Sequence, residues 1–120
     1  MEKNNLGSWG EERAARYLRL RAYRILDKNY RCRLGEIDLI ARRGGYVVFV
    51  EVKLRKSDRF GTAGEFVNRA KQERILATAQ LWLQEHETEL QPRFDVIEIY
   101  APEGPTGKVT INHIENAFVE

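Results

Sequence analysis

Two β-favouring segments on either side of a Gly44-Gly45 pair constrain the fold more than any other feature of the sequence. Residues 35–42 and 46–54 are rich in Ile, Val and Phe, and each is as long as an ordinary strand. A two-glycine connection between such segments favours a tight turn, because glycine adopts the positive φ angles that hairpin turns require. The sequence therefore predicts a β-hairpin with its turn at the glycines.

The predicted register places acidic residues of the two strands next to each other. Asp38 lies opposite Glu51, and Glu36 lies opposite Lys53. Because side chains alternate between the faces of a strand, these four residues share one face with apolar neighbours. The opposite face is apolar throughout, with Ile37, Leu39, Ala41, Val48, Val50, Val52 and Leu54.

A hairpin this apolar belongs to the protein interior, where two opposed carboxylates are costly unless a positive group lies between them. Lys53 is one such group, two residues beyond Glu51 on the same face. A divalent cation is the other, since Mg²⁺ binds one or two carboxylates together with water and phosphate. The hairpin alone leaves both interpretations open: an internal ion-pair cluster with Lys53 as the counter-ion, or a metal site.

The rest of the chain completes a single mixed α/β domain spanning residues 1–120. A helix over 8–21 is indicated by Ser8 as a capping residue, with Glu11 three positions later as in a capping box. A second, longer helix is predicted over 66–87 from apolar residues at helical spacing. The remaining segments are strands over 23–30, 94–100 and 108–114, a loop over 56–65 and a turn over 102–107, which gives the order αβββαββ.

Charge is unevenly distributed along the chain. Residues 1–75 hold 18 Lys and Arg against 10 Asp and Glu, a net charge of +8, whereas residues 76–120 carry −6. A basic part of this kind suits a polyanion such as nucleic acid, although a solvated basic surface has the same composition. No apolar segment is long enough to cross a membrane, no signal pattern opens the chain, and the single Cys32 forms no internal disulfide. We therefore expect a cytoplasmic protein.

The hairpin sequence resembles that of the YraN-like family of uncharacterised bacterial proteins. The likeness extends along nearly the whole chain, through the motifs Gly7-Ser8-Trp9-Gly10-Glu11, Tyr23-Arg24-Ile25-Leu26, Gly35-Glu36-Ile37-Asp38-Leu39, Glu51-Val52-Lys53, Lys71-Gln72, Arg93-Phe94-Asp95-Val96 and Asn116-Ala117-Phe118. That family is in turn similar to the restriction-endonuclease-like superfamily, and in particular to archaeal Holliday-junction resolvases. The resemblance implies a nuclease-like core, a mixed sheet of about five strands flanked by two main helices.

The superfamily signature is an acid, a spacer and then (Asp/Glu)-x-Lys on the adjacent strand. Asp38 and Glu51-Val52-Lys53 match it, with Ile37 where a proline is usual. The resemblance implies that Asp38, Glu51 and the Val52 carbonyl hold Mg²⁺ or Mn²⁺, and that Glu11 contributes from the first helix. Lys53 would position or deprotonate the attacking water, or stabilise charge in the transition state.

Further polar residues surround this predicted site. Helical spacing indicates that Gln72 faces inward, where the superfamily often has a residue that orients water or phosphate; the alternative is a solvated position at the start of the helix. Arg55, Lys56, Arg59 and Lys71 are expected to contact nucleic acid, although each could equally be an ordinary surface charge.

The function expected from these features is a Mg²⁺-dependent endonuclease that hydrolyses phosphodiester bonds in DNA, with structural rather than sequence preference. The alternative is a non-catalytic nucleic-acid-binding or adaptor module with the same fold. A homodimer would fit a two-fold symmetric DNA junction, but the sequence shows no interface.

Overall fold

The computed structural model of the chain describes residues 2–55 and 67–118, with side chains from Gly7 onward. Within these residues, two helices and five strands follow one another in the predicted order αβββαββ. They are α1 (Glu2–Leu20), β1 (Arg24–Cys32), β2 (Gly35–Arg43), β3 (Tyr46–Arg55), α3 (Arg69–His86), β4 (Gln91–Tyr100) and β5 (Thr110–Ile114). The α/β fold class expected from the sequence is confirmed.

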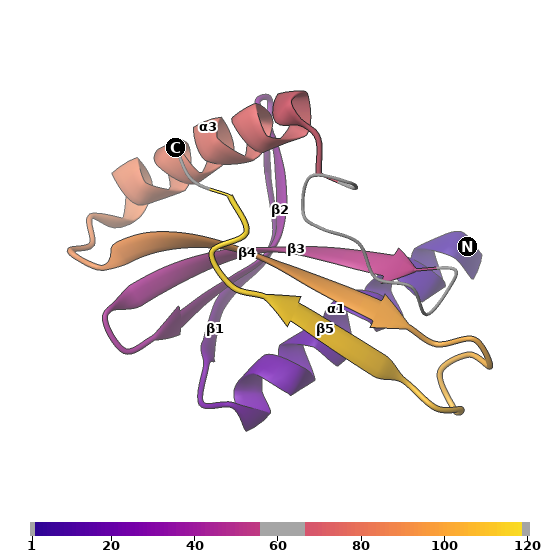
Figure 1. Cartoon of the computed structure of the whole chain (residues 1–120). Helices are drawn as coiled ribbons and strands as arrows, with labels where there is room; N and C mark the ends of the chain where they lie inside the picture. The colour runs from indigo at the N-terminus through magenta and orange to yellow at the C-terminus, as the bar shows by residue number, and fades with distance from the viewer. Residues whose placement is uncertain (1, 56–66, 119–120) are drawn as a thin grey trace.

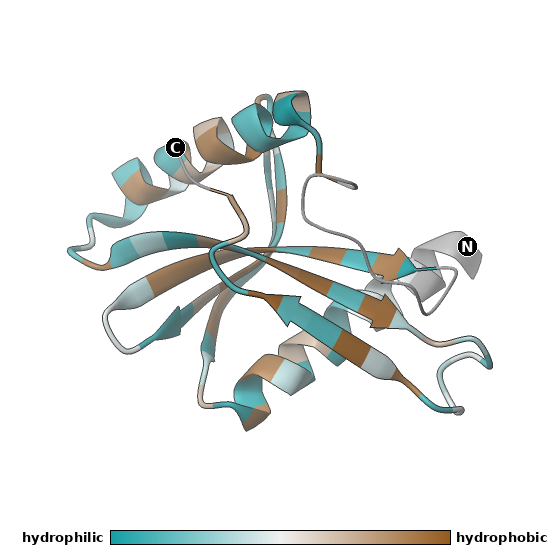
Figure 2. Ribbon diagram, in the orientation of Figure 1, coloured by the Kyte–Doolittle hydropathy of each residue, from teal (hydrophilic) through white to brown (hydrophobic). Residues whose placement is uncertain are grey.

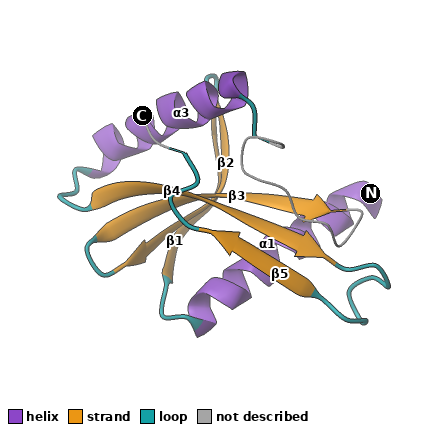
Figure 3. Cartoon of the chain, in the orientation of Figure 1, coloured by secondary structure: helices purple, strands orange, loops and turns teal. Residues whose placement is uncertain are grey.

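The five strands form one mixed sheet in the order β1-β2-β3-β4-β5. Only β3 and β4 are parallel; the other neighbours are antiparallel. A parallel pair needs a crossover connection, and α3 lies in the connection between β3 and β4. The two helices cover opposite faces of the sheet (Figure 1; Figure 3). Within the described residues, neither helix is long and apolar enough to cross a membrane.

Each helix packs on its own hydrophobic core. On the α1 side, Ala14, Ala15 and Leu18 pack against residues of the middle strands such as Val48 and Ile97. On the α3 side, the core members from the helix are Ile75, Ala79 and Trp82, and those from the strands and the C-terminal segment include Phe49, Phe94 and Phe118. Figure 2 shows hydrophobic stretches in the central strands, and α3 alternates between hydrophobic and hydrophilic stretches as expected for a helix with one buried face.

The hairpin between β2 and β3 has the predicted register as far as Leu39, but the predicted pairing of Glu36 with Lys53 is wrong, because Glu36 pairs with Arg31 of β1 and Lys53 with Glu98 of β4. The β2–β3 partners run from Arg43 opposite Tyr46 to Leu39 opposite Val50, which is the last pair. Beyond that pair the Val52 N–H donates a hydrogen bond to Asp38 Oδ2 at 2.8 Å. A side chain thus replaces the strand partner, and β2 leaves β3 at Asp38.

This departure corrects the prediction that Ile37 lies on the same face as Leu39. Ile37 is buried in the core on the α3 side, together with Ile40, whereas Leu39 packs on the α1 side. Strict alternation holds only while β2 continues in the plane of the sheet. Beyond Asp38, β2 pairs among the described strands only with β1, where Ile37 lies opposite Tyr30, and both residues pack on the α3 side.

The end of the β1–β2 hairpin is held against α3. Gly35 has a φ of 153°, and a Cβ there would lie 3.1 Å from Thr78 Oγ1 and 3.4 Å from Arg74 Cβ. Tyr30 on β1 donates a hydrogen bond to Glu85 Oε1 at 2.8 Å. These contacts fix the hairpin beside the helix, where Figure 1 shows the turn between β1 and β2 next to α3.

The predicted start of the first helix is wrong. Helix α1 begins at Glu2, so Ser8 lies inside the helix and caps nothing. Capping residues are also tolerated within helices, and a match to the capping-box pattern does not by itself locate a helix start. The capping-box interpretation of Glu11 therefore falls.

The second helix begins later than predicted, because Asn68 caps it. The Asn68 side chain accepts a hydrogen bond from the Lys71 N–H at 2.9 Å, and the helix starts at Arg69. The strand after it begins at Gln91 rather than Phe94 and includes Pro92. That position tolerates proline because β5 pairs with β4 only from Val96 onward, which leaves Pro92 on an open edge. The predicted loop over 56–65 lies outside the described residues.

Candidate functional site

Asp38 and Glu51 lie at the point where β2 separates from β3. Asp38 is 9% exposed and Glu51 is 8% exposed. Glu51 follows Phe49 by two positions on β3 and therefore faces α3. The structure thus brings the two predicted metal ligands together in a largely buried place near the carboxyl end of β3.

The electrostatics of Asp38 show that this place is crowded with negative charge. Burial is the main cause that raises the pKa of Asp38 to about 7, and the nearby Glu51 carboxylate is the second. The hydrogen bond from the Val52 N–H acts in the opposite direction, and the charges of Glu11 and Glu36 add to the rise. A carboxyl group that resists ionisation in this way favours a cation beside it.

One cation, the ammonium of Lys71, already reaches this cluster. Lys71 Nζ lies 2.5 Å from Glu51 Oε2. The lysine sits in the first turn of α3, where the Asn68 cap holds its backbone. We expected Lys71 among the nucleic-acid contacts, and in this structure without nucleic acid its ammonium pairs with Glu51.

Glu11 approaches the cluster from α1. It is half-buried, and its charge contributes to the raised pKa of Asp38. The neighbouring Gly10 allows the helix to come close to the end of β3, since a Cβ on Gly10 would lie 3.3 Å from Leu54 Cδ2. Among the described residues, however, no group of three or more His, Cys, Asp or Glu side chains is close enough together to hold a metal ion. Asp38 and Glu51 are two carboxylates, and Mg²⁺ can bind one or two carboxylates with water completing its coordination.

Lys53 lies beside a buried acid that the sequence analysis missed. In the parallel register of β3 and β4, Lys53 is the partner of Glu98, which is fully buried. Glu98 Oε1 accepts a hydrogen bond from Asn112 Nδ2 at 2.7 Å, and Glu98 Oε2 is 3.6 Å from Arg55 Nε. The sequence could have indicated that Glu98 faces the core, because it follows Phe94 and Val96 on the same side of β4 by alternation. It could not have indicated that Glu98 lies beside Lys53, because that depends on the register between β3 and β4.

The other predicted site residues that the structure describes, Gln72 and Arg55, bind partners other than Asp38 and Glu51. Gln72 is half-buried, and its Nε2 donates to the Val67 carbonyl at 2.8 Å, so in this structure the amide secures the segment that leads into α3. Arg55 belongs to the end of β3, near Glu98. Lys56 and Arg59 lie outside the described residues.

A second cluster of buried charge centres on Asp95 of β4. Arg93 donates to both carboxylate oxygens, at 3.0 and 2.9 Å. The ring Nε2 of His113 lies 2.7 Å from Oδ2, and the Asn116 N–H donates to Oδ1 at 3.0 Å. Burial raises the pKa of Asp95, but these hydrogen bonds together bring it below the ordinary value. The network continues from Arg93 to the Tyr23 hydroxyl at 2.7 Å.

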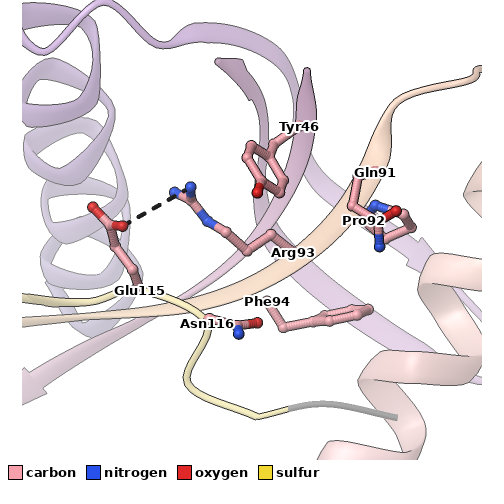
Figure 4. A pocket seen from close by; sticks show the side chains of 7 residues that line it. All are labelled: Tyr46, Gln91, Pro92, Arg93, Phe94, Glu115 and Asn116. Atoms are coloured by element: carbon pink, nitrogen blue, oxygen red, sulfur yellow. Dashed lines mark ion pairs between the residues drawn. The ribbon is translucent and has the colours of Figure 1, made fainter. Parts of the chain in front are cut away.

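A cavity of about 760 Å³ adjoins the Asp95 cluster. Its lining, drawn in Figure 4, consists of Tyr46, Gln91, Pro92, Arg93, Phe94, Glu115 and Asn116. Tyr46 and Gln91 are the first residues of the parallel strands β3 and β4, so this cavity lies at the opposite end of those strands from Glu51 and Lys53. Its main charge, Arg93, is already bound to Asp95, and Arg93 also lies 4.0 Å from Glu115 (dashed in Figure 4). The candidate site is therefore the carboxylate cluster and not this cavity.

Comparison with known proteins identifies relatives along almost the full length of the chain. A protein of Caldanaerobacter subterraneus subsp. tengcongensis is 44% identical over 119 residues, which cover 98% of each chain. One of Symbiobacterium thermophilum is 48% identical over 94% of this chain and 95% of its own, and one of Alkaliphilus oremlandii is 49% identical over 94% and 97%. All three are described as UPF0102 proteins.

The family profile leads to the same assignment. Residues 10–99 match the description "Uncharacterised protein family UPF0102". The matched segment includes Glu11, Asp38, Glu51, Lys53 and Lys71, and it ends before His113. The chain belongs to the UPF0102 family, the YraN-like group that its hairpin motifs had indicated.

Proposed function

We propose that this protein is a metal-dependent nuclease that hydrolyses phosphodiester bonds in DNA and selects DNA structure rather than sequence. The observation that carries the proposal is the placement of two largely buried carboxylates, Asp38 and Glu51, at the branch between β2 and β3. Neighbouring buried carboxylates repel each other and lose hydration, so a divalent cation between them would relieve both costs.

The residues that would hold the cation are Asp38, Glu51 and the Val52 carbonyl, with Glu11 at the margin from α1. Mg²⁺ or Mn²⁺ suits these oxygen donors. When bound, the metal would polarise the scissile phosphate and lower the pKa of the attacking water. Asp38 keeps one oxygen on the Val52 N–H, which fixes its carboxylate relative to β3.

Lys53 supplies the cationic side chain of the proposed mechanism. It lies two residues beyond Glu51 on the same side of β3 and is half-buried. From there its ammonium would orient the water or stabilise the charge that builds on the phosphate oxygens, or its neutral amine would deprotonate the water. Gln72, at the start of α3, would orient water or phosphate next to it once DNA is bound.

The substrate follows from the charge of the chain and from the resemblance to resolvases. The basic part over residues 1–75 would attract the DNA backbone, with Arg55, Lys56, Arg59 and Lys71 as phosphate contacts. Phosphate contacts position a duplex without reading its bases, which agrees with a preference for branched or single-stranded structure. A homodimer would match the two-fold symmetry of a junction.

The proposal is tested by Asp38→Asn and Lys53→Ala on branched, nicked and single-stranded DNA with Mg²⁺ or Mn²⁺. We expect each change to lower the cleavage rate at least about 100-fold, because each removes a group that acts in the transition state. DNA affinity measured in EDTA should stay within about threefold, since most of the affinity comes from phosphate contacts elsewhere. Asp27→Asn is the matched control, because Asp27 accepts a local hydrogen bond from the Lys28 N–H on β1, away from the cluster, and its loss should leave cleavage unchanged.

The second candidate function is a non-catalytic nucleic-acid-binding or adaptor module. It is favoured by the internal pairing of the acids, since Lys71 neutralises Glu51 and Arg55 lies beside Glu98. It predicts DNA affinity that is indifferent to metal, and no cleavage of any of these substrates by the unmodified protein. That combined result would contradict the nuclease proposal.

A further inference from the structure

Within the described residues, Glu51 and Lys71 form an ion pair that joins the two main parts of the site. The ammonium of Lys71 lies 2.5 Å from Glu51 Oε2, and the Glu51 side chain is only 9% exposed. Asp38, the other carboxylate, has the Val52 N–H as its hydrogen-bond donor. The ammonium of Lys71 therefore contacts an oxygen of the Glu51 carboxylate, which is one of the groups that would bind the proposed metal ion.

The backbone of Lys71 is fixed, but its side chain extends along a partly open path. Asn68 Oδ1 holds the Lys71 N–H at 2.9 Å at the start of α3. The Lys71 side chain itself is 36% exposed. A lysine has a flexible four-carbon stem, so its ammonium can leave Glu51 for solvent or for a phosphate without movement of the helix.

We propose that Lys71 is a built-in cation that Glu51 exchanges for the metal ion, and that metal binding thereby releases Lys71 toward a DNA phosphate. This inference rests on the proposed nuclease function. A divalent ion and an ammonium compete for the same carboxylate oxygen, because both need to contact it directly and they repel each other. The released ammonium lies at the edge of the site, where the phosphate backbone has to approach if the scissile bond is to reach Asp38 and Glu51.

Two consequences follow. Without metal, Lys71 balances part of the negative charge of the cluster, and DNA gains little from it. With metal, Lys71 is free to contribute one phosphate contact. Metal and DNA therefore bind with positive coupling, and by linkage each raises the affinity for the other by the same factor.

The first test measures Mn²⁺ affinity of the purified full-length protein by titration calorimetry in the absence of DNA. Lys71→Gln should bind Mn²⁺ roughly fivefold more tightly than the unmodified protein, the factor that corresponds to an ion pair of about 1 kcal/mol. Lys71→Arg keeps a competing cation and should stay within about twofold of the unmodified protein.

Arg69→Gln is the matched control for this titration. Arg69 lies in the same turn of α3 but pairs with Glu73 at 3.5 Å, and its side chain is 87% exposed. Its removal takes away the same charge without touching Glu51, so the Mn²⁺ affinity should change by less than about twofold because solvent and salt screen an exposed charge. Circular dichroism and thermal melting verify that each variant is folded, and Lys71→Arg supplies a second comparison if Lys71→Gln is unstable.

The second test measures DNA binding in the Lys53→Ala background, which binds without cleaving. Lys71→Gln should weaken DNA binding several-fold in Mg²⁺ and reduce its salt dependence by about one phosphate contact. In EDTA the same substitution should leave DNA affinity unchanged, because Lys71 is then held by Glu51. A lysine that simply contacts DNA would weaken binding equally in both conditions.

The outcomes separate this inference from the proposed function. Equal Mn²⁺ affinity of the unmodified protein and Lys71→Gln, or equal loss of DNA affinity with and without metal, would overturn the exchange while the nuclease proposal stands. If the unmodified protein and Lys71→Gln both bind no Mn²⁺, the proposed function fails and the exchange fails with it.

Discussion

Two buried aspartates, Asp38 and Asp95, differ in how their charge is compensated. Asp95 receives hydrogen bonds from Arg93 and the Asn116 N–H and lies 2.7 Å from His113 Nε2, and together these contacts bring its pKa below the ordinary value despite burial. Asp38 receives one backbone N–H, and burial together with the neighbouring Glu51 raises its pKa to about 7. Both lie in the same sheet, on β2 and β4 with β3 between them, so the difference comes from their partners.

This contrast distinguishes a structural cluster from a candidate site. A buried carboxylate whose partners are all supplied by the chain holds the fold together and needs nothing from outside. A buried carboxylate that is destabilised by other carboxylates has an unmet demand for positive charge, and such groups concentrate at functional sites.

Asp95→Asn should destabilise the protein by about 3–5 kcal/mol, because it leaves the guanidinium of Arg93 buried without its counter-ion. Asp38→Asn should have the opposite effect in metal-free buffer. It should raise the free energy of unfolding above neutral pH, since it removes repulsion from Glu51. Chemical denaturation of both variants and the unmodified protein in EDTA provides the comparison. Similar losses of unfolding free energy in both variants would show that the clusters do not differ in the way described.

The free energy of unfolding of the metal-free protein should also depend on pH differently for the two aspartates, with a smaller effect than the substitutions above. The folded pKa of Asp38 is raised above its unfolded value, so the folded protein binds the extra proton at acidic pH, and this stability is lost as the pH rises toward 7. The folded pKa of Asp95 is lowered, so its contribution is present above the unfolded pKa and is lost only as the pH falls through the folded pKa.

The unmodified protein should therefore lose about 2 kcal/mol relative to Asp38→Asn between about pH 5 and about pH 8. Denaturation curves at several pH values measure this difference, and saturating Mg²⁺ should abolish it. A stability difference between the two proteins that stays constant with pH would contradict the raised pKa of Asp38.

The sequence predicted the fold and the proximity of Asp38 to Glu51 because both depend on local patterns. The Gly44-Gly45 turn and the alternation of the flanking strands determine the hairpin register, and that register brings Asp38 near Glu51. Helical spacing likewise indicated both helices. These signals lie within short segments and need no knowledge of how distant segments pack.

The details that the sequence missed depend on contacts between distant segments. The Lys71–Glu51 pair requires the packing of α3 on β3, and the neighbourhood of Lys53 and Glu98 requires the parallel register of β3 and β4. Ile37 packs on the α3 side, beyond the last strand pair between β2 and β3. No local pattern distinguishes these arrangements from the alternatives.

The most direct test of the account is a crystal structure of the protein soaked in Mn²⁺, with anomalous difference density measured at the cluster. The account predicts a peak about 2.0–2.3 Å from oxygens of Asp38 and Glu51, with Lys71 Nζ displaced from Glu51. Well-ordered Asp38 and Glu51 with no peak between them, and Lys71 still bound to Glu51 at saturating Mn²⁺, would contradict it.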